Sequence, residues 1–173
     1  NGRMAGTFFP VLSWTLIWAV FATVTNFLFG VILALIINAK GLKLKKMWRT
    51  IFVITIAVPQ FISLLLMRNF LNDQGPLNAF LEKIGLISHS LPFLSDPTWA
   101  KFSIIFVNMW VGIPFTMLVA TGIIMNLPSE QIEAAEIDGA SKFQIFKSIT
   151  FPQILLIMMP SLIQQFILMS STF

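Results

Sequence analysis

The sequence has no cysteine and a single histidine, His89. The lack of cysteine excludes disulfides, thiolate metal ligands and a cysteine nucleophile, and it excludes a metal site built from histidine and cysteine. Charged residues are also scarce, at 10% of the 173 positions, whereas apolar residues make up 57%. A typical soluble domain is about 25% charged. The composition therefore argues against a water-soluble globule and for a membrane protein.

The sequence contains long stretches without any charged residue. Four such stretches occur, and a helix needs about 20 apolar residues to cross a bilayer. One stretch has only 18 residues, between Arg49 and Arg68, and it spans the bilayer if these side chains reach the two interfaces. We expect an all-α, polytopic helix bundle with about four spans, at residues 10–38, 49–70, 100–125 and 152–173.

Neither end of the sequence looks like the end of a complete protein. The chain begins at Asn1 rather than Met and ends at Phe173 inside the last apolar stretch. No basic segment followed by a short apolar core and a small-residue cleavage site marks a signal peptide. We expect residues 1–173 to be an internal piece of a longer polypeptide and part of one transmembrane domain.

Basic residues predict the orientation of the spans. The first loop carries five of them and no acidic residue: Lys40, Lys43, Lys45, Lys46 and Arg49. Short loops rich in Lys and Arg stay in the cytoplasm, and a headgroup-binding patch is a compatible interpretation. Alternation of the spans then places residues 71–99 outside and residues 126–151 inside. The net charge of +4 follows this topology and does not indicate nucleic acid binding.

The external segment, residues 71–99, contains its own short helix. Apolar residues recur at helical spacing from Leu77 to Ile84, and Gly85 is a suitable stop. Such a helix is expected to lie in the membrane interface. It is either a docking surface for an external partner or a lid on the bundle.

The internal segment, residues 126–151, predicts a helix, a glycine turn and a second helix. The first helix starts at Ser129, and Gly139 can take the left-handed conformation that ends it. Ser141 and Gln144 then match a capping box for the second helix. The apolar stripe of that second helix is formed by Phe143, Phe146 and Ile149. The segment is either an L-shaped knob that docks on a partner or an ordinary amphipathic connector between two spans.

Seven positions in and after this segment match a known motif. They read Glu-Ala-Ala, three residues, Gly, nine residues and Ile-x-Phe-Pro, at Glu133, Ala134, Ala135, Gly139, Ile149, Phe151 and Pro152. This spacing resembles the EAA loop of permease subunits in binding-protein-dependent ABC importers, with Phe151 in place of the usual leucine. The resemblance implies a type I ABC importer transmembrane domain whose 126–151 loop couples to a cytoplasmic ABC ATPase dimer.

The resemblance also implies a role for each matching residue. Glu133 would pair with a basic residue of the ATPase, Ala134 and Ala135 would form the close-contact surface, and Gly139 would make the turn. The remaining coupling-loop residues are Asp138, Ile149 and Pro152. Further implied partners are a second permease subunit, an external solute-binding protein and the lipid of a bacterial inner membrane.

The third span carries polar and irregular positions, which are costly in a bilayer unless they face protein or a cavity. Asn108, Gly112 and Phe115 share one face of this span, close to Pro114. These residues either line a cavity or form a packing kink in which Asn108 bonds a neighbouring helix.

Three segments resemble the larger membrane subunit of maltose and maltodextrin permeases: residues 57–63, 94–98 and 107–115. In that family the helix matching residues 108–115 lines a sugar site at the membrane midplane. The resemblance therefore implies a substrate path at Val111, Gly112 and Phe115, with Asn108 on the same face as Gly112 and Phe115.

Two positions depart from that family. Ile56 stands where the family has an aromatic residue, and Met169 to Phe173 stand where it has an asparagine-rich stretch that contacts sugar. The hydroxyls of Ser171 and Thr172 are candidates to replace those contacts. The chain also has no tyrosine, a common carbohydrate-binding side chain.

The expected function is sugar import, of maltodextrin type, without chemistry of its own. No G-x-x-x-x-G-K-[ST] phosphate loop occurs, so ATP and Mg are expected on the partner ATPase, and no cofactor or metal on this chain. A permease for another polar solute, such as a polyamine, is the alternative. An intramembrane enzyme would need a nucleophile and base or metal ligands at membrane depth, and the apolar stretches contain no Asp, Glu, His, Lys or Cys. A structural or sensory membrane subunit is a further alternative, but it would not require the L-shaped knob that carries Glu133.

Overall fold

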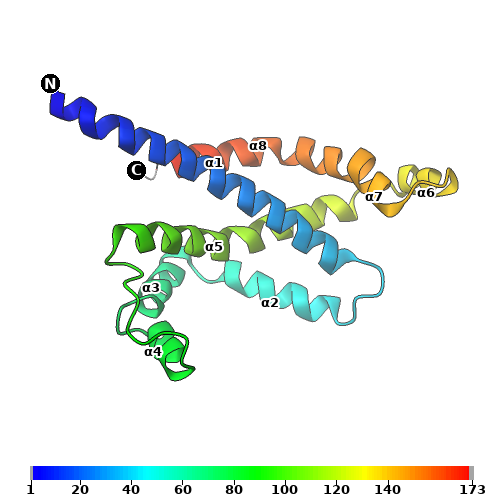
Figure 1. Ribbon diagram of the computed structural model, residues 1–173. Helices are drawn as coiled ribbons and strands as arrows, with labels where there is room; N and C mark the ends of the chain where they lie inside the picture. Colours follow the sequence, from blue (N-terminus) through cyan, green and yellow to red (C-terminus); the bar gives the residue numbers. More distant parts are fainter. Residues whose placement is uncertain (1, 172–173) are drawn as a thin grey trace. The chain divides into compact units, whose positions relative to one another are not determined.

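The computed structural model describes residues 2–171, and its elements in that range are helical (Figure 1). The long helices are α1 (Gly2–Asn38), α5 (Pro97–Met125) and α8 (Phe151–Ser170). The shorter elements are α2 (Lys45–Ala57), α3 (Gln60–Phe70), α4 (Pro76–Lys83), α6 (Ser129–Ile137), α7 (Lys142–Ile145) and the π-helical turn η1 (Phe146–Thr150). The all-α fold class predicted from the sequence is confirmed.

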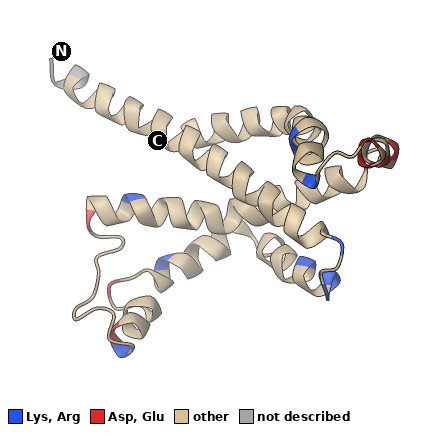
Figure 2. Cartoon of the chain, turned by 45° about the vertical axis from the view of Figure 1, so that its right-hand side comes forward, with Lys and Arg blue, Asp and Glu red and all other residues tan. Residues whose placement is uncertain are grey.

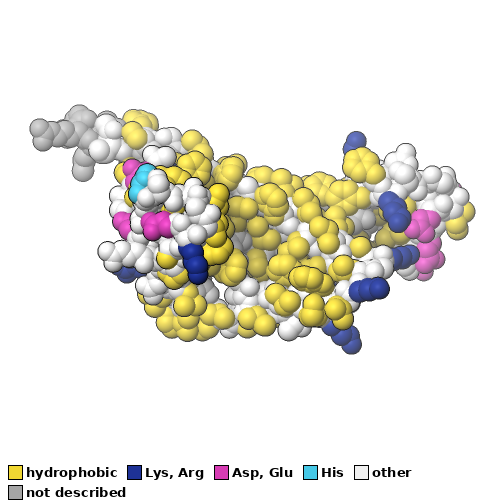
Figure 3. Space-filling view, turned by 60° about the horizontal axis from the view of Figure 1, so that its bottom comes forward, with side chains coloured by type: hydrophobic (Ala, Val, Ile, Leu, Met, Phe, Trp, Pro, Cys, Tyr) yellow, Lys and Arg dark blue, Asp and Glu magenta, His cyan; other side chains and the backbone are white. Residues whose placement is uncertain are grey.

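Three helical stretches are long and apolar enough to cross a membrane: Gly6–Asn38, Pro97–Met125 and Lys142–Ser170. The first two agree with the predicted spans at 10–38 and 100–125. Charged residues lie in the short helices, in the connecting loops and near the ends of the long helices, whose middles carry none (Figure 2). Large apolar side chains are exposed along these helices, as on the face seen in Figure 3. Such surfaces suit a lipid environment or contact with other apolar helices.

The second predicted span, 49–70, is wrong as a single helix. It is divided into α2 and α3, which meet at a bend of 94°, so the pair is a broken span or a re-entrant loop. Pro59 causes the break because its nitrogen cannot donate a hydrogen bond and its ring clashes with the carbonyl four residues earlier. Its backbone has φ −52° and ψ 134°, and α3 starts at the next residue, Gln60.

The fourth predicted span, 152–173, begins too late. The helical stretch already starts at Lys142 and passes through η1 into α8. Pro152 has no N–H and so cannot make the backbone hydrogen bond of an ordinary helix interior. The wider π-turn η1 precedes it, and in this turn the N–H of Phe151 donates to the carbonyl of Phe146. The second arm of the predicted knob is therefore the start of the membrane helix and not a separate element.

The chain divides into two compact units: unit 1, made of Asn1–Lys45 and Thr116–Phe173, and unit 2, made of Lys46–Phe115. In unit 1, α8 lies along α1 (Figure 1). The ring centroids of Phe27 and Phe151 lie 6.0 Å apart between these two helices. The buried apolar side chains of unit 1 include Phe27, Val31, Ala34, Ile37, Met117, Ile154 and Met158.

The ends of α1 and α5 meet inside unit 1. Asn38, the last residue of α1, donates from Nδ2 to Oγ1 of Thr121 over 3.1 Å, and Thr121 lies one turn before the end of α5. The segments that follow α1 and α5 therefore begin at the same end of unit 1. This agrees with the prediction that the basic loop and the 126–151 segment share one side of the membrane.

In unit 2, buried Asn78 holds the segment at residues 71–99 together. Its Nδ2 donates to the carbonyls of Asp73 and Leu91 over 3.1 and 2.9 Å, and the Leu91 N–H donates to its Oδ1 over 3.0 Å. The short helix predicted in this segment is α4, and it stops at Gly85 with φ +75°. The segment at residues 71–99 is thus a folded element held together by a buried polar side chain.

Candidate functional site

The knob, residues 129–150, consists of α6, a turn at Gly139, α7 and η1. α6 follows Pro128, whose backbone is extended, and it carries Glu130 in its first turn. A carboxylate there is stabilised by the unsatisfied N–H groups of the helix start. The helix, glycine turn and helix predicted from the sequence are confirmed, with the second helix continuing into α8.

α6 has two different sides. Residues four apart share one side of a helix, whereas residues two apart differ by about 200° around its axis. Glu133 and Ile137 therefore share an outer side, where Ile137 is 85% exposed. Gln131 and Ala135 share the opposite side, and Ala135 is half-buried. The acidic residues of α6 lie at the surface in the view of Figure 3.

Gly139 ends α6 with a pair of hydrogen bonds typical of a left-handed cap. Its φ is +80°, its N–H donates to the carbonyl of Glu136 over 3.1 Å, and the Ala140 N–H donates to the carbonyl of Ala135 over 2.9 Å. This is the Schellman arrangement, which glycine favours because it has no Cβ to clash. The predicted turn is confirmed, and it sets the angle between α6 and α7.

Ser141 and Gln144 form the predicted capping box. The Ser141 N–H donates to Oε1 of Gln144 over 2.7 Å, and the Gln144 N–H donates to Oγ of Ser141 over 3.3 Å. Two backbone N–H groups that the helix cannot satisfy are bonded in this way. The direction of α7 is therefore defined from its first residue.

A hollow of about 390 Å³ lies between the two arms of the knob. Its walls are Ala135, Asp138, Gly139, Ala140, Gln144, Ile145, Ser148 and Ile149. Four of the predicted coupling residues are among them, namely Ala135, Asp138, Gly139 and Ile149, so residues from both arms of the knob meet here. Glu133 and Ala134 are exposed on α6, and Pro152 is exposed in the first turn of α8.

Side-chain contacts connect the knob to the long helices of unit 1. Gln153 of α8 donates from Nε2 to Oε1 of Gln131 on α6 over 2.8 Å. The rings of Phe146 and Phe151 lie 5.7 Å apart, and Phe151 in turn contacts Phe27 of α1. The predicted apolar stripe is only partly buried, because Phe143 is 70% exposed and the buried residue of α7 is Ile145. The knob is therefore tied to both α8 and α1.

The predicted substrate-path residues are distributed over both units. Asn108, Val111 and Gly112 are half-buried and Phe115 is 45% exposed, all on the part of α5 in unit 2. α5 continues as one helix through Pro114. Ser171 caps α8 in unit 1 and donates its hydroxyl to the carbonyl of Leu168, whereas Thr172 lies outside the described residues. The role of these residues in a substrate path stays a prediction.

Known proteins resemble this chain over most of its length. A family model described as "Binding-protein-dependent transport system inner membrane component" matches residues 26–173. The chain belongs to this family. It is 38% identical over 162 residues to the galactooligosaccharides transport system permease protein GanP of Bacillus subtilis (strain 168), covering 92% of this chain and 38% of that protein.

A second relative and a solved structure agree with this assignment. The maltodextrin transport system permease protein MdxF of the same bacterium is 38% identical over 174 residues, covering 95% of this chain and 39% of that protein. The crystal structure of a bacterial ABC transporter involved in the import of the acidic polysaccharide alginate aligns with a TM-score of 0.78 and 27% identity, covering 91% of this chain and 55% of that one. The chain thus spans about two fifths of the length of the curated relatives it matches.

Family membership confirms the resemblance on which the sequence prediction depended. The chain is a multi-pass membrane component with the fold of ABC importer transmembrane domains. This family consists of transport components. Among residues 2–171, no group of three or more His, Asp or Glu side chains is placed to hold a metal ion.

Sequence reasoning missed two features of the knob. The exposed side chain of Ile137 lies on the same side as Glu133, and the spacing of four residues between them was a signal that could have identified this. The hydrogen bond between Gln131 and Gln153 joins residues 22 positions apart, and their spacing in the sequence carries no sign of it.

Proposed function

We propose that this chain is part of the permease subunit of an ATP-driven importer that moves a neutral oligosaccharide of maltodextrin type across a bacterial inner membrane. The observation that carries the proposal is the knob: Glu133 lies on the exposed side of a helix whose other side leads to α8 and α1. Membership in the binding-protein-dependent family supports an external solute-binding protein as the partner that delivers the cargo.

In this proposal, the outer side of α6 docks on a cytoplasmic ABC ATPase. Glu133 supplies a carboxylate for a basic residue of the ATPase, and the exposed Ile137 adds an apolar contact beside it. Ala134 leaves room for close backbone approach because its side chain is small. ATP and Mg belong to the ATPase dimer, and a second permease subunit with its own knob would complete the translocation path.

Transport follows from movement of the knob. When the ATPase dimer closes on ATP, α6 moves with it, and the contacts of Gln131 and Phe146 carry the displacement to α8 and α1. Those two helices pack along each other and so move as a pair. Rocking of the helices would open the sugar path to one side of the membrane and close it to the other.

The chemistry of the candidate path favours a neutral sugar. Asn108, Val111, Gly112 and Phe115 carry no charge, so an acidic sugar would find no counter-charge on this face. The ring of Phe115 is exposed and can stack on the apolar face of a sugar ring. The relatives named for galactooligosaccharides and for maltodextrin support an oligosaccharide as cargo.

Reconstitution tests the proposal directly. The full-length permease, its second permease subunit, the ATPase and the binding protein are placed in proteoliposomes, and uptake of labelled maltohexaose is measured with and without ATP. We expect uptake that requires both ATP and the binding protein. Uptake of spermidine instead of maltohexaose would favour the polyamine alternative, and the absence of uptake with any solute would overturn the proposal.

A further inference from the structure

A hydrogen bond joins α6 to the helix that continues into the membrane. The side-chain amide of Gln153 donates from Nε2 to Oε1 of Gln131 over 2.8 Å. Gln131 lies in the first turn of α6 and Gln153 in the first turn of α8. Neither residue belongs to the EAA motif, whose nearest positions are Glu133 and Pro152.

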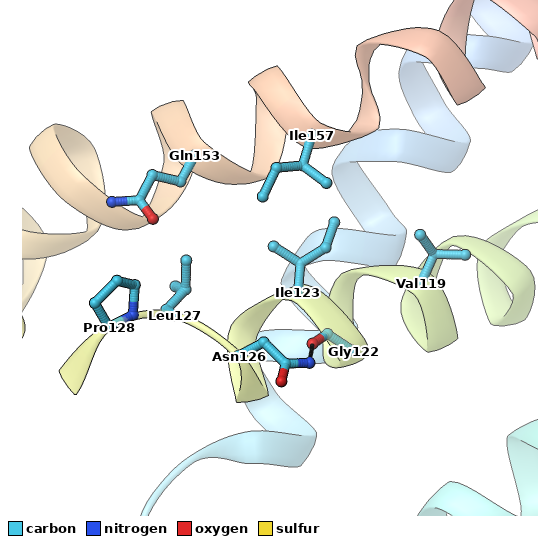
Figure 4. Close-up of a pocket in the computed structure, with 8 residues that line it drawn as sticks. All are labelled: Val119, Gly122, Ile123, Asn126, Leu127, Pro128, Gln153 and Ile157. Carbon is cyan, nitrogen blue, oxygen red and sulfur yellow. Dashed lines mark hydrogen bonds between the residues drawn. The ribbon is translucent and has the colours of Figure 1, made fainter.

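The surroundings of this hydrogen bond are open. A hollow of about 450 Å³ lies between the end of α5 and the start of α8, lined by Val119, Gly122, Ile123, Asn126, Leu127, Pro128, Gln153 and Ile157. Figure 4 shows Gln153 on the α8 side of this hollow, across from Leu127 and Pro128. A packed core would resist any relative movement of the elements that share it. The residues that line this hollow include Gln153 of α8 and none of α6, so the exposed amide pair is a direct connection between α6 and α8 beside it.

Gln131 lies on the side of α6 that faces away from the proposed ATPase contact. Two residues correspond to about 200° around a helix, so Gln131 and Glu133 lie on nearly opposite sides. A force applied at Glu133 therefore passes through the helix to Gln131. The Gln131 side chain is in direct hydrogen-bond contact with α8.

On α8, Gln153 is next to the buried side of the helix. Ile154 is fully buried and Met158, one turn further along, is also buried, in the unit where α8 packs along α1. A displacement of Gln153 consequently displaces residues that are packed in the core of unit 1. The first turn of α8 therefore moves together with the buried residues of unit 1 when α6 displaces Gln153.

The geometry points to the Gln131–Gln153 hydrogen bond as the coupling tie that transmits movement of the knob to α8. This inference rests on the proposed function. Both glutamines are positioning residues, because they act through the helices that carry them and not by touching sugar or nucleotide. A neutral hydrogen bond contributes little to net folding stability, so its loss is expected to reduce coupling while the subunit still folds and assembles.

The test measures maltohexaose molecules transported per ATP hydrolysed, using the complete reconstituted importer. Gln131→Leu and Gln153→Leu are each expected to lower this ratio roughly two- to threefold, the low end of what one neutral hydrogen bond represents, because this bond is exposed to water. The double variant is expected to be no worse than either single variant, because both substitutions remove the same contact. Combining Gln131→Glu with Gln153→Lys, which restores a polar pair, is expected to recover most of the ratio.

Co-purification of the ATPase with each variant separates coupling from assembly. Normal assembly with a lowered transport ratio in the single variants, and recovery of the ratio in the Gln131→Glu, Gln153→Lys combination, would support the tie. The tie would be overturned by unchanged transport ratios, by losses that add up in the double variant, or by loss of ATPase binding. The proposed function would remain intact in each case, provided that the wild-type importer transports sugar. Failure of the wild-type importer to transport sugar would overturn the proposed function and the tie together.

Discussion

Gly30 of α1 lies so close to Thr116 of α5 that a Cβ on Gly30 would fall 2.5 Å from both Cβ and Cγ2 of the threonine. The backbone nitrogen of Met117 would be 3.1 Å away. Thr116 and Met117 are both buried, so neither has free space into which to move. Small residues at such crossings allow the backbones of membrane helices to approach closely. This contact holds α1 against the end of α5 within unit 1.

Gly30→Ala is expected to destabilise unit 1 by about 1–3 kcal/mol, the usual cost of overpacking a core. The measurement is thermal unfolding of the full-length permease in detergent. Gly122→Ala is the matched control on α5, because a Cβ there meets nothing within 4 Å, and it is expected to be neutral or slightly stabilising. Equal melting temperatures for the two variants would contradict the close crossing.

The cap at Gly139 predicts different effects for two substitutions. A Cβ at this position meets nothing within 4 Å, so the cost comes from the backbone, whose φ is +80°. Gly139→Ala is expected to destabilise the knob by about 1–2 kcal/mol, and Gly139→Asn by less, because asparagine visits the left-handed region more readily. Hydrogen exchange of the Ala140 amide, which donates to Ala135, reports the change. Wild-type protection in Gly139→Ala would show that the cap does not depend on glycine.

Asn78 is expected to be essential for the external segment. Asn78→Ala removes hydrogen bonds to Asp73 and to both backbone groups of Leu91, and each buried group left unpaired costs about 1–3 kcal/mol. Limited proteolysis in detergent is expected to cleave residues 71–99 faster, while the spans stay protected. Asn126→Ala is the control, since its hydrogen bond to Gly122 is exposed. Equal cleavage of both variants would contradict this role.

The parts of the fold that the sequence predicted correctly depend on local chemistry. Gly139 needs only its own backbone freedom to end a helix, and the Ser141–Gln144 box closes within four residues. The first and third spans follow from the absence of charge over lengths that match a bilayer. Four of the predicted coupling residues line one hollow and Glu133 lies on an exposed helix side, whereas their coupling role stays a prediction.

The parts that could not be predicted depend on how the helices continue after a proline interrupts their backbone hydrogen bonds. Pro59 and Pro152 both lie in apolar stretches and both lack an N–H, yet one marks a 94° bend and the other follows a π-turn within a continuing helical stretch. Composition alone cannot separate these outcomes, because packing of the neighbouring segments decides between them. The contact between Gln131 and Gln153 likewise requires the fold of the knob to exist first.

The central claim is that Glu133 anchors the knob to an ATPase, and the binding affinity of the ATPase for the full-length permease complex tests it most directly. Loss of one partner from a buried charge pair costs about 2 kcal/mol or more, so Glu133→Ala is expected to weaken binding by about thirtyfold or more. Glu82→Ala removes the same charge from an exposed position of α4, in the segment predicted on the opposite side of the membrane, and is expected to stay within about threefold of wild type. If Glu133→Ala binds the ATPase as tightly as wild type does, the account is contradicted.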